Sequence, residues 1–163
     1  MTAGPRPGAL ATIAFTVPGR PIPKGSTRSF NHFRTGSIIT RQQNADALYP
    51  WEKRVAHEAR AALAPLAIPW ALNGAYLCDV DFFFSRPKSH YRRSGSLKPG
   101  APRWHTTRPD EDKITRAIRD ALTSILWTDD SQVVGGTGHK WYVEAGGSEG
   151  VGIEVSALAM EPE

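Results

Sequence analysis

The segment from Ala75 to Ser85 most restricts the fold of this chain, because its residues alternate between two faces. One face carries Cys78, Val80, Phe82 and Phe84, and the other carries Leu77, Asp79, Asp81 and Phe83. Successive side chains of a strand point to opposite sides of a sheet. The segment is therefore predicted to be a β-strand with one buried face and one face that meets water.

Two helices are predicted, because apolar residues recur every three or four positions. The first lies between about Asn44 and Leu63, and the second runs from Asp110 to Leu126 with Pro109 at its start. The apolar stripe of the first helix consists of Leu48, Trp51, Val55, Ala59 and Ala62. The stripe of the second consists of Ile114, Ile118, Ala121, Leu122 and Ile125. Both helices are expected to pack one face on the core.

Four further strands are predicted around these elements. They are Ala11 to Val17, Ser37 to Thr40, Gln132 to Glu144 and Gly150 to Leu158. Strands and helices alternate irregularly and two strands close the chain, which indicates an α+β fold, a mixed β-sheet with helices packed on one face. The 163 residues fit a single domain, residues 1–163. Residues 1–8, rich in Pro and Gly, are expected to be disordered.

Positive charge is concentrated in a basic loop, residues 86–108, although the whole chain has a formal net charge of only +4. This segment contains no Asp or Glu and seven basic residues: Arg86, Lys88, Arg92, Arg93, Lys98, Arg103 and Arg108. Its Pro and Gly residues predict a long, mobile loop. Tyr91, Trp104 and His105 add rings that suit base stacking. A solvated loop is the alternative, but the charge pattern favours nucleic-acid binding.

Several classes of protein are disfavoured. Cys78 is the only cysteine, so no intramolecular disulfide can form, and a cytoplasmic protein without a Cys-based zinc site is expected. Pro65 and Pro69 interrupt the most apolar region, so no membrane span is expected. The histidines lack metal-ligand spacing, and no serine nucleophile motif occurs. The glycine run 135–138 predicts a bulge rather than a phosphate loop, and no small-molecule cofactor is expected.

Acidic residues flank the second helix: Asp110, Glu111 and Asp112 at its start, and Asp129 and Asp130 in the turn after it. Acids at a helix start are also explained by the helix dipole, which stabilises each by about 0.3–1 kcal/mol. A helix of this length separates the groups by about 24 Å. They can meet only if the chain folds back after Trp127, which would place Asp130 on a strand beside the helix start, or if a partner chain contributes.

Converging carboxylates would repel one another unless a divalent cation neutralised them, and Mg²⁺ is the predicted occupant, with Mn²⁺ as an alternative. Arg116 lies four residues after Asp112 on the same side of the helix, where it is expected to contact a phosphate or to form a surface ion pair. Asp79 and Asp81 form a rival pair, although polar residues are also expected on the wet face of a strand.

Three segments together resemble the RusA-like Holliday-junction resolvases. One is Arg108-Pro-Asp-Glu-Asp-Lys-Ile-Thr-Arg followed by Ala-Ile-Arg-Asp-Ala-Leu, and then Trp127-Thr-Asp-Asp-Ser-Gln-Val-Val and Lys140. The others are Val17-Pro-Gly-Arg-Pro-Ile-Pro-Lys-Gly and Phe84-Ser-Arg-Pro-Lys-Ser-His. The resemblance implies a homodimeric α+β nuclease that binds branched DNA, the four-way junction, and nicks opposing strands with magnesium.

Position by position, the resemblance implies metal ligands at Asp110, Asp112 and Asp130, with Asp129 a weaker candidate. The family carries Asn after its second Asp and a catalytic Lys four residues after that Asp, whereas this chain has Lys113 and Arg116. Arg keeps the charge but is a poor proton donor. Arg116 is therefore an expected catalytic residue that shares its role with Lys113 or Lys140.

A set of basic residues is expected to bind DNA: Lys24, Arg28, Lys88, Arg92, Arg93, Lys98, Arg103, Lys113 and Lys140. Two alternatives remain open. One is a non-catalytic junction-binding or DNA-binding protein in which the acids are structural, and the other is a nuclease for other branched DNA. Dependence of cleavage on magnesium separates the first alternative from the nucleases.

Overall fold

The computed structural model describes residues 8–66 and 69–159, without the side chains of Arg28, Phe30, Ile39, Thr40 and Arg41. The disorder expected for residues 1–8 concerns residues outside this part, apart from Gly8. No helix in the described ranges is long and apolar enough to cross a membrane.

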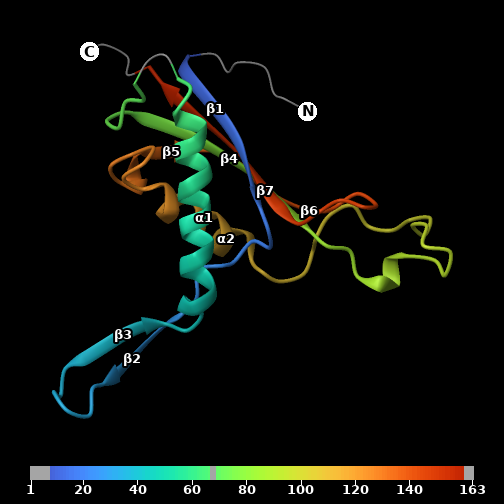
Figure 1. Ribbon diagram of the computed structural model, residues 1–163, viewed down its shortest axis with the longest axis horizontal. Coiled ribbons are helices and arrows are strands. Elements are labelled where there is room, and N and C mark those ends of the chain that lie inside the picture. Colours follow the sequence, from blue (N-terminus) through green and yellow to red (C-terminus); the bar gives the residue numbers. More distant parts are fainter. Residues whose placement is uncertain (1–7, 67–68, 160–163) are drawn as a thin grey trace.

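A mixed five-stranded sheet forms the centre of the fold (Figure 1). Its strands are β1 (Ala9–Pro18), β4 (Ala75–Phe84), β5 (Val133–Gly135), β6 (Gly138–Tyr142) and β7 (Gly150–Leu158). Strand β7 lies between β1 and β4 and is antiparallel to both, whereas β5 and β6 both pair with β4 in parallel. The mixed sheet and its helices confirm the α+β class expected from the sequence.

Both α-helices, α1 (Ala45–Leu63) and α2 (Glu111–Leu122), cover one face of this sheet. The alternation in β4 explains why, since Val80, Phe82 and Phe84 are at most 1% exposed on the helix side. Ile114 and Ile118 of α2 pack into the same core and are fully buried. No helix of the described chain covers the opposite sheet face, to which Phe83 contributes a partly exposed ring.

A separate two-stranded hairpin, β2 (Thr27–Asn31) and β3 (Ile38–Gln42), projects away from the main sheet (Figure 1). The sequence predicted β3, but the predicted end, Thr40, lies two residues before the observed end, Gln42. The sequence did not predict β2. Gly, Ser, Asn and basic residues dominate this stretch, so its sequence is typical of a loop. Antiparallel backbone pairing of β2 with β3 forms the strand instead.

The second helix ends at Leu122 rather than at the predicted Leu126. Ser124 adopts a φ of 66°, which breaks the helix, and its N–H donates to the Trp127 carbonyl at 2.7 Å. Leu126 and Trp127 are nevertheless fully buried. Apolar residues continue at helical spacing beyond the end of α2, because the turn after the helix also packs on the core.

The predicted strand from Gln132 to Glu144 is divided into β5 and β6 by the glycine run. Gly136 has a φ of 137°, and a Cβ at this position would overlap the backbone of Cys78 in β4. Glycine is required for such a close approach of two backbones. The pairing of β4 with β5 shifts by one residue at Val134, so the bulge lies just before the glycine run in which it was predicted.

The basic loop has little regular structure, as expected, with one 3-10 turn, η1 (Lys88–His90). It extends beyond the end of the sheet before it returns to β6 (Figure 1). Two backbone hydrogen bonds fasten its end to β6, from the His105 N–H to the Lys140 carbonyl at 3.0 Å and from the Tyr142 N–H to the Arg103 carbonyl at 2.9 Å. This end of the loop is therefore part of the sheet edge.

Candidate active site

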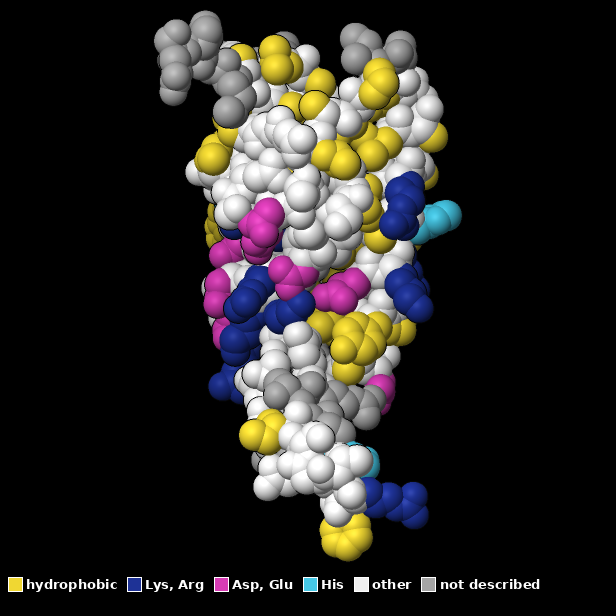
Figure 2. Space-filling model, turned by 90° about the vertical axis from the view of Figure 1, so that its left-hand side faces the viewer, with side chains coloured by type: hydrophobic (Ala, Val, Ile, Leu, Met, Phe, Trp, Pro, Cys, Tyr) yellow, Lys and Arg dark blue, Asp and Glu magenta, His cyan; other side chains and the backbone are white. Residues whose placement is uncertain are grey.

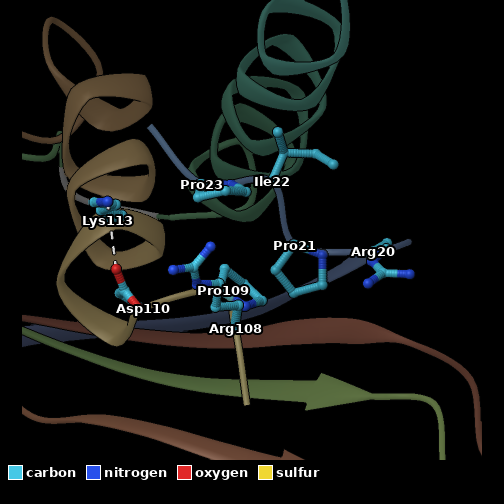
Figure 3. A pocket seen from close by; sticks show the side chains of 8 residues that line it. All are labelled: Arg20, Pro21, Ile22, Pro23, Arg108, Pro109, Asp110 and Lys113. Carbon is cyan, nitrogen blue, oxygen red and sulfur yellow. Dashed lines mark ion pairs between the residues drawn. The ribbon is translucent and has the colours of Figure 1, made fainter. Parts of the chain in front are cut away.

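The start of α2 presents two carboxylates in different directions. Asp110 is the N-cap residue, with an extended backbone (φ −69°, ψ 140°), and no side chain caps the helix there. Its carboxylate lies 3.3 Å from the ammonium of Lys113 (Figure 3). Asp112, one residue inside the helix, instead lines a separate pocket of about 510 Å³. The sharp entry into the helix separates residues that are neighbours in sequence.

This pocket, called here the acidic pocket, brings Asp112 and Asp130 together. Its lining residues are Glu111, Asp112, Thr115, Arg116, Arg119, Asp130, Gly136, Thr137 and Gly138. The chain folds back after α2, as convergence requires, and Asp130 lies in a 3-10 turn, η2 (Asp130–Gln132), in agreement with the turn expected after the helix. A strand at Asp130, which was considered as the route to convergence, is not formed. Acidic and basic side chains gather in a band across the middle of the face shown in Figure 2.

Asp110 does not line the acidic pocket. It lines a second pocket, of about 430 Å³, whose other residues are Arg20, Pro21, Ile22, Pro23, Arg108, Pro109 and Lys113 (Figure 3). Among the residues that the structure describes, no three His, Cys, Asp or Glu side chains are close enough to hold a metal ion together. The structure thus brings together two of the three acids that the resemblance implied.

Glu111 lines the pocket too, although the sequence analysis named it only as a member of the acidic cluster and not as a site residue. Its Oε1 accepts a hydrogen bond from the Thr115 hydroxyl at 2.6 Å. Its carboxylate also occupies the space that a side chain at Gly138 would need, with Cδ 2.6 Å from an added Cβ. Helical residues four apart face the same side, so the Glu-Thr spacing was an available signal.

The choice between Asp129 and Asp130 follows from the local turn. Asp129 caps η2, and its Oδ1 accepts a hydrogen bond from the Ser131 N–H at 2.9 Å. Hydrogen bonds from Ser131 also lower the pKa of Asp129. Asp129 therefore has a structural role, while Asp130 is the acid of this turn that lines the pocket.

Two arginines of α2, Arg116 and Arg119, supply positive charge to the acidic pocket. Arg116 is exposed, whereas Arg119 is half-buried and was not singled out in the sequence. Arg119 also lies near Cys78, whose thiol has a pKa raised to about 12 by burial despite the opposing charge of Arg119. Cys78 is therefore a neutral core residue rather than a nucleophile.

The rival acids of β4 have structural partners. Asp79 Oδ1 accepts hydrogen bonds from the N–H and the hydroxyl of Thr137, at 2.8 and 2.7 Å. Asp81 accepts one from the Trp141 indole at 2.7 Å and lies 3.4 Å from the His139 ring nitrogen. Each carboxylate thus fastens a neighbouring segment to β4, in line with the structural alternative.

Comparison with known proteins identifies the family. The family model described as endodeoxyribonuclease RusA matches residues 18–156. The chain is also 30% identical over 154 residues to the Bacillus subtilis (strain 168) protein YqaN, a match that spans 89% of this chain and 98% of that protein. The chain belongs to the RusA endodeoxyribonuclease family. This confirms the resemblance seen in the sequence, and with it an enzyme that hydrolyses DNA phosphodiesters.

In this RusA-family chain, three of the basic residues expected to bind DNA have protein partners. Lys24 pairs with Asp120 of α2 and lies 3.5 Å from Glu52 of α1, so it links the two helices. Lys113 pairs with Asp110. Lys140 donates to the carbonyls of Thr107 and Pro109, at 2.7 and 2.6 Å, and ties the loop end to the start of α2.

The remaining basic candidates lie in the two projecting parts of the RusA-family fold. Arg28 is on β2, although its side chain is outside the described atoms. The candidates in the basic loop are all exposed: Lys88, Arg92, Arg93, Lys98 and Arg103. These loop side chains meet solvent, where a DNA backbone can reach them.

Proposed function

We propose that this chain is a divalent-metal-dependent endonuclease that resolves four-way DNA junctions by paired nicks. The observation that carries the proposal is the acidic pocket, in which Asp112 and Asp130 line the same space as Arg116 and Arg119. Carboxylates near one another favour a bound cation, and guanidinium groups bind phosphate oxygens. The combination suits a phosphodiester held beside a metal ion.

The donor types fit magnesium or manganese, because Asp112, Asp130 and Glu111 offer only oxygen atoms, although these carboxylates line one pocket without forming a three-ligand cluster among the described residues. Asp110 remains part of the proposed set. Its carboxylate is about half exposed, and its pair with Lys113 is a surface ion pair worth about 1 kcal/mol or less. A divalent cation that binds the Asp110 carboxylate therefore displaces only this weak ion pair.

A bound divalent cation would supply a water of lowered pKa and would offset charge on the phosphate. The side chains of this chain would orient the substrate around it. Arg116, exposed on α2, is proposed to contact the scissile phosphate, with Arg119 beneath it. Since arginine stays protonated, it is a poor proton donor, and Lys113 and Lys140 are the candidates for that role. Lys113 lines the second pocket and pairs with Asp110, and the Lys140 ammonium is held by two carbonyls.

The test is cleavage of a synthetic four-way junction by the full chain, with Mg²⁺ or with a chelator. We expect two symmetry-related nicks with Mg²⁺ and intact DNA with the chelator. Equal cleavage in both would overturn metal dependence. A junction that is bound yet never cut would indicate a non-catalytic binding protein, and preferential cleavage of flapped DNA would indicate another branched substrate.

A homodimer is part of this proposal, because two nicks on opposing strands of a symmetric junction call for two active sites related by a two-fold axis. Sedimentation at micromolar concentration should give twice the chain mass. A monomer that still makes paired nicks would contradict the dimer while leaving the chemistry in place.

The exposed cations of the basic loop are proposed to bind phosphates. Replacing Arg92, Arg93 and Lys98 together with Gln should weaken junction binding and flatten the plot of log affinity against log salt by about 0.9 per lost contact. Fluorescence anisotropy over a salt series measures both effects. Lys53→Gln with Arg60→Gln, exposed on α1, is the control. An unchanged slope in the triple variant would place the DNA contacts elsewhere.

A further inference from the structure

Two indole rings stack on the sheet face that lacks helices. The rings of Trp104, at the end of the basic loop, and Trp141, on β6, have centroids 3.9 Å apart and planes inclined by 23°. Trp104 is 49% exposed, whereas the core residue Trp127 is fully buried. Phe83, the β4 partner of Trp141, is 36% exposed beside them. A wide aromatic surface is thus left open to solvent.

This surface is held rigidly by its neighbours. Trp104 forms an isolated antiparallel bridge with Trp141, flanked by the hydrogen bonds of the loop end to β6. The Trp141 indole donates to Asp81, and the ring of His105 stacks on Phe84 at 4.1 Å in the core. A ligand that stacks on rings already fixed in place loses little side-chain entropy on binding.

Positive charge lies beside the rings. The Arg103 guanidinium carbon lies 4.8 Å from the centre of the Trp141 ring, and Trp104 ends a loop rich in Lys and Arg. The nearest acid, Asp81, is engaged by Trp141 and His139. An aromatic surface with a guanidinium beside it fits a nucleotide, whose base stacks while its phosphate meets the cation, better than it fits an apolar protein segment.

The stack and the acidic pocket share one strand. Gly138 lines the pocket on the side of α2, where an added Cβ would meet Glu111, and Trp141 follows three residues later on β6, about 10 Å along the strand. Because side chains alternate along a strand, the stack lies on the sheet face opposite the pocket. We propose that Trp104 and Trp141 form a stacking site for an unpaired base of the DNA substrate, on the sheet face opposite the acidic pocket. This inference rests on the proposed function, since it names the part of a branched DNA that the enzyme reads.

Fluorescence anisotropy in the presence of a chelator tests the stacking site. It compares two labelled DNA strands of equal length, oligothymidylate and an abasic strand. The wild-type chain should bind oligothymidylate more tightly. Trp104→Ala should weaken that binding by about 5- to 100-fold and leave abasic binding unchanged. Trp104→Phe should restore most of the loss. Tyr49→Ala, which removes a 53% exposed ring from α1, is the matched control.

Equal affinity of the wild-type chain for both strands would overturn the stacking site, as would an unchanged Trp104→Ala variant. Dissociation of a dimer by Trp104→Ala would instead show that the surface joins two copies of the chain. Unchanged abasic binding and an unchanged melting temperature exclude misfolding. Because no cleavage is measured, a failure to cut junctions would overturn the proposed function without affecting this result.

Discussion

Asp112→Asn and Asp130→Asn are each expected to lower Mg²⁺-dependent junction cleavage by at least about 10³-fold while junction binding stays the same or tightens. Each substitution replaces a carboxylate that is proposed to bind the metal and removes a negative charge from the acidic pocket, which both residues line. The lost charge would otherwise repel the DNA phosphates. Single-turnover cleavage and anisotropy with the same junction measure the two effects separately.

The matched control is Asp129→Asn, in the same turn. Asn is as good an N-cap as Asp, so η2 should form and cleavage should change by less than about threefold. Asp79→Asn should be similarly mild, because an amide oxygen can still accept from Thr137. Normal cleavage by the Asp112 and Asp130 variants, or loss of cleavage in Asp79→Asn alone, would refute the assigned site.

Arg116→Lys refines this prediction, since it restores the residue that the family resemblance implies at that position. Activity should be retained if residue 116 contacts the scissile phosphate, because both side chains carry the required charge. A loss as large as that of Asp112→Asn would mean that the planar guanidinium has a different role.

Gly136→Ala is expected to destabilise the fold by about 3 kcal/mol or more. The methyl group would lie 2.6 Å from the carbonyl carbon of Cys78, at a φ of 137° that side chains rarely adopt. Neither backbone can yield without breaking the pairing of β5 and β6 with β4. Thermal melting should show a decrease of about 6–12 °C.

Gly146→Ala separates backbone strain from overlap. Gly146 also has a positive φ, 81°, but nothing lies within 4 Å of an added Cβ. Its substitution should cost only about 1–2 kcal/mol. If the two variants melt at the same temperature, the overlap of the added methyl group with the Cys78 backbone contributes nothing to the loss of stability in Gly136→Ala.

Elements with a strong local pattern were predicted well from the sequence. The first helix and the strands β4 and β7 agree with prediction within a residue or so, because burial repeats along each of them with the period of its own structure. Strand β2 was missed because its backbone pairing with β3 leaves little trace in residue type. The second helix was predicted too long because Leu126 is buried without being helical.

The sequence by itself determined the α+β class, the two acidic clusters and the RusA family, since all three depend on residue type and spacing along the chain. Only the tertiary structure decided that Asp112 and Asp130 line one pocket, that Asp110 pairs with Lys113, and that Trp104 stacks on Trp141. These contacts depend on where the chain reverses and on how a loop end joins a sheet edge. Such contacts join residues distant in sequence, and local periodicity carries no information about them.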